Sequence, residues 1–397
     1  MAQSEQPVKT SPTLGTLQPS LTLSITAKAK SLAASGEDVI SLSAGEPDFD
    51  TPDHIKEAAK EALDAGDTKY TPAAGRPELR QKIAAKLQEE NGVQTNAEQI
   101  VVAPGAKFSV FTAVATLCAP GDEVIVPAPY WLSYPEMVRA TGATCVSPAT
   151  KAENNFCLTP QQFEQAITSR TKLLILNTPS NPTGGVYPRE FLEGIAELAV
   201  KHNVMIVSDE IYEKLIYAGR EHTSIASLGE EISARTITVN GFSKAYSMTG
   251  WRLGYSAGPD WIVQKIKALQ SHTTSGPTSF VQAGASRALE NSEAFIQNMR
   301  STFEERLACM HQRLSDIRSL SVTKPEGAFY IFPDISSLGL DSMTFADRLL
   351  NEKKLAVIPG KPFGADSNIR LSYAYDPGTI EKGCQRLAEF CDELAAS

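Results

Sequence analysis

Short apolar segments alternate with helical segments between residues 76 and 240, and this alternation leaves few folds open to the chain. The expected strands are 100–102, 123–127, 143–147, 172–177, 205–208 and 236–240, and the expected helices are 76–90, 107–117, 133–140 and 189–201. Strands this apolar are buried on both faces, as in a parallel sheet that is covered by helices. The alternation therefore predicts an α/β domain with a mostly parallel sheet.

The segments that flank this region have a different pattern. Residues 21–35 predict a helix, 39–43 predict a short strand, and Thr51-Pro52 opens a further helix with Pro in its first turn. Apolar residues from Phe295 to Leu314 recur every three or four positions, which predicts one long amphipathic helix.

The C-terminal part predicts a smaller α+β unit. Its expected elements are strands at 329–332, 356–358 and 368–372 and a closing helix from Pro377. A chain of 397 residues is too long for one ordinary core. We expect an N-terminal arm (1–45) packed with the small domain, a large domain (46–290), and a small domain with its linking helix (291–397).

Composition excludes several classes of protein. The net charge of -9 argues against nucleic acid as the main partner. Six cysteines form no C-x-x-C pair and five histidines do not cluster, so no metal site is expected. No apolar run reaches the ~18 residues that span a membrane, and residues 1–20 lack the apolar core of a secretory signal. We expect no membrane partner and a cytoplasmic location.

The segment Asn240-Gly-Phe-Ser-Lys244, followed by Gly-Trp-Arg252, has the residues that pyridoxal 5′-phosphate (PLP) chemistry requires. A lysine amine condenses with the cofactor aldehyde. A hydroxyl at Ser243 and a guanidinium at Arg252 can bind a doubly charged phosphate. Taken by itself, Lys244 fits an ordinary surface lysine better than a cofactor site, and the next features reverse this.

Three further segments place polar residues at strand ends, in a loop or at the start of a helix. Asp209 follows an apolar strand and precedes Tyr212; a buried Asp needs a partner, and a protonated pyridine nitrogen would be one. Asn181 lies in a loop pinned by two prolines. Gly105, with Ala106 and Lys107, opens a helix and offers N–H groups to an anion. Taken singly, these are also compatible with a helix cap, a surface turn or an ordinary strand-to-helix turn.

Two more positions complete the set. Trp131 follows a strand and can stack on a flat ring, although a core aromatic is an equal interpretation. Arg370 lies in a short apolar strand, where a guanidinium would face a polar surface or grip a ligand carboxylate with two hydrogen bonds.

Together these segments resemble the fold-type I PLP enzymes, and within them the class I aminotransferases, over essentially the whole chain. Ala44–Phe49, Trp131-x-Ser-Tyr-Pro135 and Ser180–Gly184 are most similar to the aspartate/prephenate branch (subgroup Ib). The resemblance implies a large domain with a seven-stranded, mostly parallel sheet and a smaller α+β domain. It also implies PLP as cofactor and transfer of an amino group between an amino acid and a 2-oxo acid.

The resemblance assigns roles by position. Lys244 would bind the cofactor and shuttle a proton, with Asp209 and Tyr212 as the other catalytic residues. The implied cofactor contacts are Gly105, Ala106, Lys107, Trp131, Asn181, Asp209, Tyr212, Ser243, Lys244 and Arg252. Tyr70 resembles a tyrosine that reaches the phosphate of a neighbouring subunit, which implies a homodimer with shared sites. The implied substrate contacts are Gly45, Lys107, Trp131, Asn181 and Arg370.

Substrate choice depends chiefly on Lys107. In subgroup Ib a lysine at this position can bind a distal carboxylate, which favours aspartate, glutamate and their oxo acids. Some relatives also use prephenate and carry a basic residue where this chain has Gln18, so prephenate would depend on Lys107 and Thr22. A first-turn lysine without a function is the other interpretation, although the helix dipole disfavours it.

Three alternatives remain open at this stage. The same fold supports lyases and decarboxylases, because a fold does not fix a reaction. A PLP-fold sensor of a transcription regulator would need a DNA-binding segment, and residues 1–40 have neither a basic patch nor a helix-turn-helix pattern. A scaffold that has lost its chemistry would not need Lys244, Asp209 and Arg252.

Overall fold

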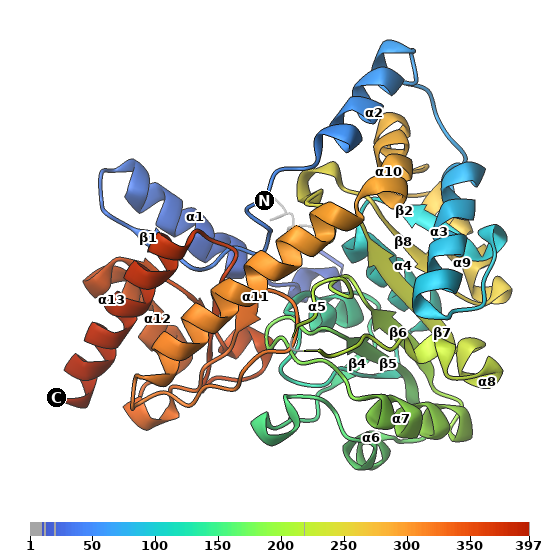
Figure 1. Ribbon diagram of the computed structural model, residues 1–397. Helices are drawn as coiled ribbons and strands as arrows, with labels where there is room; N and C mark the ends of the chain where they lie inside the picture. Colours follow the sequence, from blue (N-terminus) through green and yellow to red (C-terminus); the bar gives the residue numbers. More distant parts are fainter. Residues whose placement is uncertain (1–9, 12, 20, 218, 397) are drawn as a thin grey trace, which may run out of the picture.

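A seven-stranded sheet forms the centre of the computed structural model, which describes residues 10–11, 13–19, 21–217 and 219–396 (Figure 1). The strand order is β2-β8-β7-β6-β5-β3-β4, and only β8 runs antiparallel to its neighbours. The strands are β2 Ile100–Ala103, β3 Glu123–Ile125, β4 Thr144–Val146, β5 Thr171–Asn177, β6 Met205–Asp209, β7 Thr236–Gly241 and β8 Gly254–Ala257. The α/β fold with a mostly parallel seven-stranded sheet is confirmed.

Helices cover both faces of the sheet, because successive strand residues point to opposite faces. Leu173 and Ile175 of β5 face one apolar cluster, while Leu174 and Leu176 face another. The first side is packed by α4 (Ala106–Leu117), α5 (Ser133–Ala140) and α9 (Asp260–Ser271), and the second by α6 (Pro160–Ala166), α7 (Arg189–Lys201) and α8 (Glu230–Ser233). Near β2, α3 (Pro77–Asn91) and α2 (Asp53–Asp64) pack on α10 (Ser279–Asn291).

The C-terminal elements gather beside the sheet together with the N-terminal helix (Figure 1). The long helix α11 (Glu293–Ser315) packs on α13 (Pro377–Ala395), and α12 (Ser342–Lys353) packs on α13 as well. A three-stranded antiparallel sheet has the order β11 (Ile358–Pro359), β12 (Ile369–Ser372), β9 (Tyr330–Ile331). The strand β1 (Ile40–Ser41) pairs in parallel with β10 (Leu355–Ala356), against which α1 (Leu21–Ala34) packs.

Two strands differ from the sequence expectation, and helices α6, α9 and α10 lie where no element was expected. The strand expected at 356–358 is divided at Val357, because β10 pairs with β1 whereas β11 pairs with β12 in a different sheet. The strand β8 was not predicted, since Gly254-Tyr-Ser-Ala257 contains no apolar run. Among the described residues, no helix is long and apolar enough to cross a membrane.

Candidate functional site

A pocket of about 940 Å³ lies where strands of the large sheet end and the C-terminal elements begin. Its lining residues come from the ends of β6 and β7, the start of α4, the loop before α5, the loop after β1, and strands β9 and β12. The carboxyl edge of a parallel sheet is the usual ligand position in α/β folds. The volume suits a cofactor with a small substrate.

Lys244 follows β7 and extends its amine into this pocket. Its Nζ donates a hydrogen bond to the carbonyl oxygen of Gly45. Removal from water lowers the pKa of Lys244 to about 8, and Arg370 and Arg252 add to this effect against the opposing charge of Glu46. An amine with this pKa is partly neutral near neutral pH and can act as a nucleophile or a base.

Asp209 is the last residue of β6 and is buried at the base of the pocket. Its Oδ2 accepts a hydrogen bond of 2.8 Å from the Tyr134 hydroxyl, and its Oδ1 accepts one of 3.2 Å from the Ile211 amide. Burial raises the pKa of Asp209 to about 6, although both hydrogen bonds oppose the rise. A cation beside this carboxyl would stabilise its charged form.

Arg370 of β12 is only 2% exposed, and two protein oxygens hold its guanidinium. Its terminal nitrogens donate to Asn181 Oδ1 at 2.9 Å and to the Ser43 carbonyl at 3.0 Å. Its Nε is buried and has no hydrogen-bond partner among the residues that the structure describes. Because buried polar groups are normally hydrogen-bonded, this group calls for an acceptor that the described protein atoms do not supply.

The start of α4 and Arg252 form a cradle for an anion. Gly105 has φ +92°, and a Cβ atom at this position would lie 2.4 Å from an Arg252 Nη. Only glycine therefore lets the guanidinium approach the first amides of α4, at Ala106 and Lys107. Ser243 is buried beside them and lines the same pocket.

Lys107 and Trp131 lie together at the rim of the pocket. The Nζ of Lys107 is 4.7 Å from the centre of the Trp131 ring. Partial removal from water, aided by the charge of Arg252, lowers the pKa of Lys107. A positive charge at the rim is available for an anionic group of a ligand.

The structure brings most of the predicted site residues into one place. Those that line the pocket are Gly45, Ala106, Lys107, Trp131, Asn181, Asp209, Tyr212, Ser243, Lys244, Arg252 and Arg370, and Gly105 lies behind Arg252. Tyr70 is absent from the pocket of its own chain and is 96% exposed.

Sequence reasoning missed two tyrosines at the site. No role was assigned to Tyr134, although it lies in the quoted Trp131-x-Ser-Tyr segment, and its hydroxyl bonds Asp209. Tyr330 is the first residue of the two-residue strand β9, and no local pattern marks it. Its ring covers the Arg370 guanidinium at 4.3 Å, and its hydroxyl is 3.0 Å from that of Tyr212.

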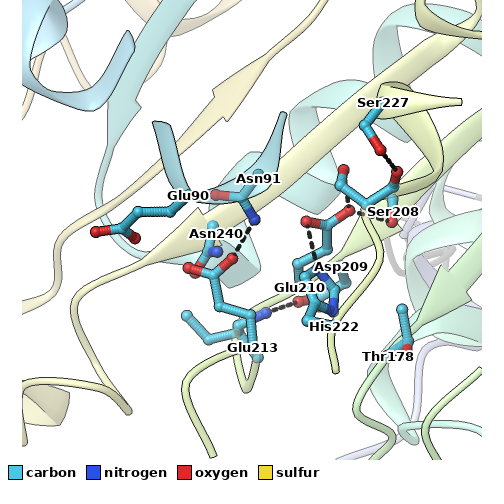
Figure 2. A network of polar contacts seen from close by, with 12 residues as sticks. Glu90, Asn91, Thr178, Ser208, Asp209, Glu210, Glu213, His222, Ser227 and Asn240 are labelled. Carbon is cyan, nitrogen blue, oxygen red and sulfur yellow. Dashed lines mark hydrogen bonds and ion pairs between the residues drawn. The ribbon is translucent and has the colours of Figure 1, made fainter. Parts of the chain in front are cut away.

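A buried polar network supports the strand end that carries Asp209 (Figure 2). Glu210 accepts hydrogen bonds of 2.8 Å from both Ser208 and Ser224, and its other oxygen is 2.9 Å from His222 Nε2. Burial opposes a charge on His222, but Glu210 and Glu213 outweigh it and raise the pKa of the imidazole.

Glu213 pairs with Lys86 in the same network. Burial opposes its ionisation, but the Lys86 charge prevails and lowers the pKa of Glu213 to about 2. Glu210, Glu213 and His222 have possible ligand atoms within 4.8 Å of one another, as in a metal site. Since these groups already have partners, we interpret them as a charge-balanced network of two carboxylates, Lys86 and protonated His222.

Comparison with known proteins agrees with this geometry. The family model described as aminotransferase class I and II matches residues 37–387. The chain is 48% identical over 380 residues to an aspartate aminotransferase of Bacillus sp. strain YM-2, covering 94% of this chain and 97% of that protein. It is 45% identical over 396 residues to an aspartate/prephenate aminotransferase of Cereibacter sphaeroides, with 97% and 99% covered.

Among solved structures, the Thermus thermophilus aspartate aminotransferase with maleate superposes with a TM-score of 0.93. The two are 43% identical, and the match covers 96% of this chain and 100% of that one. The chain belongs to the class I and II aminotransferases. It is an enzyme, and its cofactor is PLP, as the sequence predicted.

The pocket fits this cofactor. The cradle at Gly105 and Arg252 suits a phosphate, the buried carboxyl of Asp209 suits a ring nitrogen, and the Lys244 amine suits an aldehyde.

Proposed function

We propose that the protein transfers the amino group of L-aspartate or L-glutamate to 2-oxoglutarate or oxaloacetate in two half-reactions at this pocket. The observation that carries the proposal is the position of Lys244. Its amine lies in the same pocket as Asp209 and Arg370, and the charges of both residues act on its pKa. One pocket thus holds an amine, a carboxyl for a ring nitrogen and a guanidinium for a substrate carboxylate. The relatives named as aspartate aminotransferases support the choice of substrate.

We propose these roles for the cofactor contacts. Asp209 pairs with the ring nitrogen, Tyr212 and Asn181 bond the ring oxygen, and Trp131 stacks on the ring. The phosphate binds the amides of Gly105, Ala106 and Lys107, the Ser243 hydroxyl and the Arg252 guanidinium. When bound, PLP supplies an aldehyde for the amine and a ring that accepts electrons from the substrate.

The remaining chemistry is performed by side chains of the protein. Arg370 holds the substrate α-carboxylate and uses the Nε atom that has no protein partner; Asn181 and the Gly45 backbone assist. Lys244, whose amine would hold the cofactor aldehyde, would also take the proton from the substrate Cα and return it as a positioned general acid–base. Asp209, kept ionised by the ring cation, stabilises the charge on the ring nitrogen throughout.

Lys107 is our candidate for binding the distal carboxylate of a dicarboxylic substrate. Its amine lies at the rim beside Trp131. The same pocket could take prephenate, as the names of several relatives indicate for those proteins. We favour aspartate because the basic residue associated with prephenate is replaced by Gln18.

We also propose a cytoplasmic homodimer in which Tyr70 of each chain reaches the phosphate of its neighbour. Because 96% of the Tyr70 surface is exposed in the single chain, its side chain is accessible to a second chain. The division into 1–45, 46–290 and 291–397 stays part of the proposal; it is supported by the pairing of β1 with β10.

The first test records the visible spectrum of the purified holoenzyme. We expect a yellow protein whose visible band is lost on addition of aspartate and restored by 2-oxoglutarate, while Lys244→Ala shows neither change. A yellow protein that ignores both aspartate and glutamate would overturn the substrate assignment. Failure to bind PLP would overturn the whole proposal.

A further inference from the structure

Tyr330 contacts both Arg370 and Tyr212 in the pocket, although no role has been assigned to it. It is fully buried, and it starts β9 opposite Ser372 of β12, two residues from Arg370. On an antiparallel pair, this diagonal relation brings side chains of one face into contact. The Tyr330 ring accordingly lies 4.3 Å from the Arg370 guanidinium, and its hydroxyl lies 3.0 Å from the hydroxyl of Tyr212.

The direction of the hydrogen bond between the two hydroxyls follows from the number of protons. Burial raises the pKa of both Tyr212 and Tyr330, so each hydroxyl holds one proton at neutral pH. Tyr212 can give its proton to Tyr330 or to another acceptor, but not fully to both. A negatively charged ring oxygen forms the stronger, charge-assisted bond.

We propose that Tyr330 is a positioning residue. Its hydroxyl donates to Tyr212, which leaves the Tyr212 proton for the ring oxygen of the cofactor. Its ring covers the Arg370 guanidinium. This inference rests on the proposed function, which assigns Tyr212 to the ring oxygen. Donation from Tyr330 polarises the Tyr212 hydroxyl and strengthens its bond to the ring oxygen, because hydrogen bonds in a chain reinforce one another.

The test is a titration of the visible band of the holoenzyme without substrate. A donor at the ring oxygen weakens the hold of that oxygen on the proton of the lysine-bound cofactor, so it lowers the pKa of the band. Tyr330→Phe keeps the ring over Arg370 and removes only the hydroxyl. We expect it to raise the pKa of the band by about 0.2 to 0.6 units, from a 10–30% weakening of one charged hydrogen bond.

Tyr373→Phe is the matched control. Tyr373 is equally buried, lies just after β12 and donates to the Ala328 carbonyl at 3.2 Å, outside the pocket lining. We expect no change in the band for this variant. The double variant Tyr212→Phe/Tyr330→Phe should have the same pKa as Tyr212→Phe alone, since Tyr330 acts through Tyr212.

The outcomes separate the two proposals. A wild-type protein without a visible band would refute PLP binding and, with it, this inference. A visible band whose pKa moves in Tyr212→Phe but not in Tyr330→Phe would refute the role of Tyr330 alone. An equal shift in Tyr330→Phe and Tyr373→Phe, or independent shifts in the double variant, would also refute it, because a general packing effect would then explain the data.

Discussion

The hydroxyl of Tyr134 donates a 2.8 Å hydrogen bond to the carboxyl of Asp209, and both groups are buried. Tyr134 lies on α5 and Asp209 ends β6, so the contact joins a covering helix to the sheet edge. It opposes the rise in the pKa of Asp209 that burial causes. Tyr134 therefore helps to keep the carboxyl ionised before a cation is bound.

Tyr134→Phe should weaken PLP binding most at acidic pH. Without the hydrogen bond, the pKa of Asp209 rises above about 6, and a protonated carboxyl cannot pair with a charged ring nitrogen. We expect the dissociation constant of PLP to increase about tenfold or more, as for loss of a hydrogen bond to a charged group. Equilibrium titration with PLP between pH 5 and 8 measures it, with Tyr130→Phe as control. If the variant and the wild type bound PLP with equal affinity across this pH range, the role of Tyr134 in keeping Asp209 ionised would be excluded.

Lys107→Gln should lower kcat/KM for aspartate far more than for an amino acid without a distal carboxylate. Loss of one charged contact corresponds to a decrease in kcat/KM of roughly ten- to hundredfold. Steady-state kinetics with aspartate and alanine give the ratio. Lys30→Gln is the control, because Lys30 also lines the pocket. If Lys30→Gln gives the selective loss instead, the distal carboxylate is bound at the other side of the pocket.

His222→Gln should destabilise the protein in a pH-dependent manner. The pKa of His222 is higher in the folded than in the unfolded protein. Its contribution to the free energy of unfolding is therefore complete below the unfolded pKa of about 6.5 and is lost as the pH rises through the folded pKa. Removing the cationic partner of the buried Glu210 costs about 3–5 kcal/mol at pH 6. Denaturant unfolding measures the free energy of unfolding at pH 6 and at pH 9. We expect the difference in this free energy between wild type and variant to be smaller at pH 9. His272→Gln, at an exposed position, is the control; a difference that is constant with pH would mean that His222 is neutral.

Mixing two inactive variants should restore activity if sites are shared between chains. A heterodimer of Lys244→Ala and Tyr70→Ala contains one site with an intact Lys244 and an intact Tyr70 of the neighbouring chain. Co-refolding the two variants should therefore give up to about a quarter of wild-type activity, from half the dimers with one site each. Activity no higher than the sum of the separate variants would contradict the shared site.

Much of the fold followed from local patterns, but the site depended on long-range packing. The strand before Asp209 is apolar, the strand before Lys244 alternates Thr with Ile and Val, and both end in polar residues, so the sequence predicted both positions at the sheet edge. Tyr330 could not be found in this way, because its importance arises from a strand pairing with β12. The unpartnered Nε of Arg370 likewise depends on contacts with Asn181 and Ser43, which are distant in sequence.

The missing Cβ of Gly105 limits which substitutions this enzyme tolerates at position 105. The Arg252 guanidinium occupies the space that any side chain at position 105 would need. A Gly105→Ala change would displace the guanidinium while leaving every charged residue in the chain intact. Positions 105 and 252 are therefore constrained together, because a methyl group at position 105 acts on the anion cradle through the placement of Arg252.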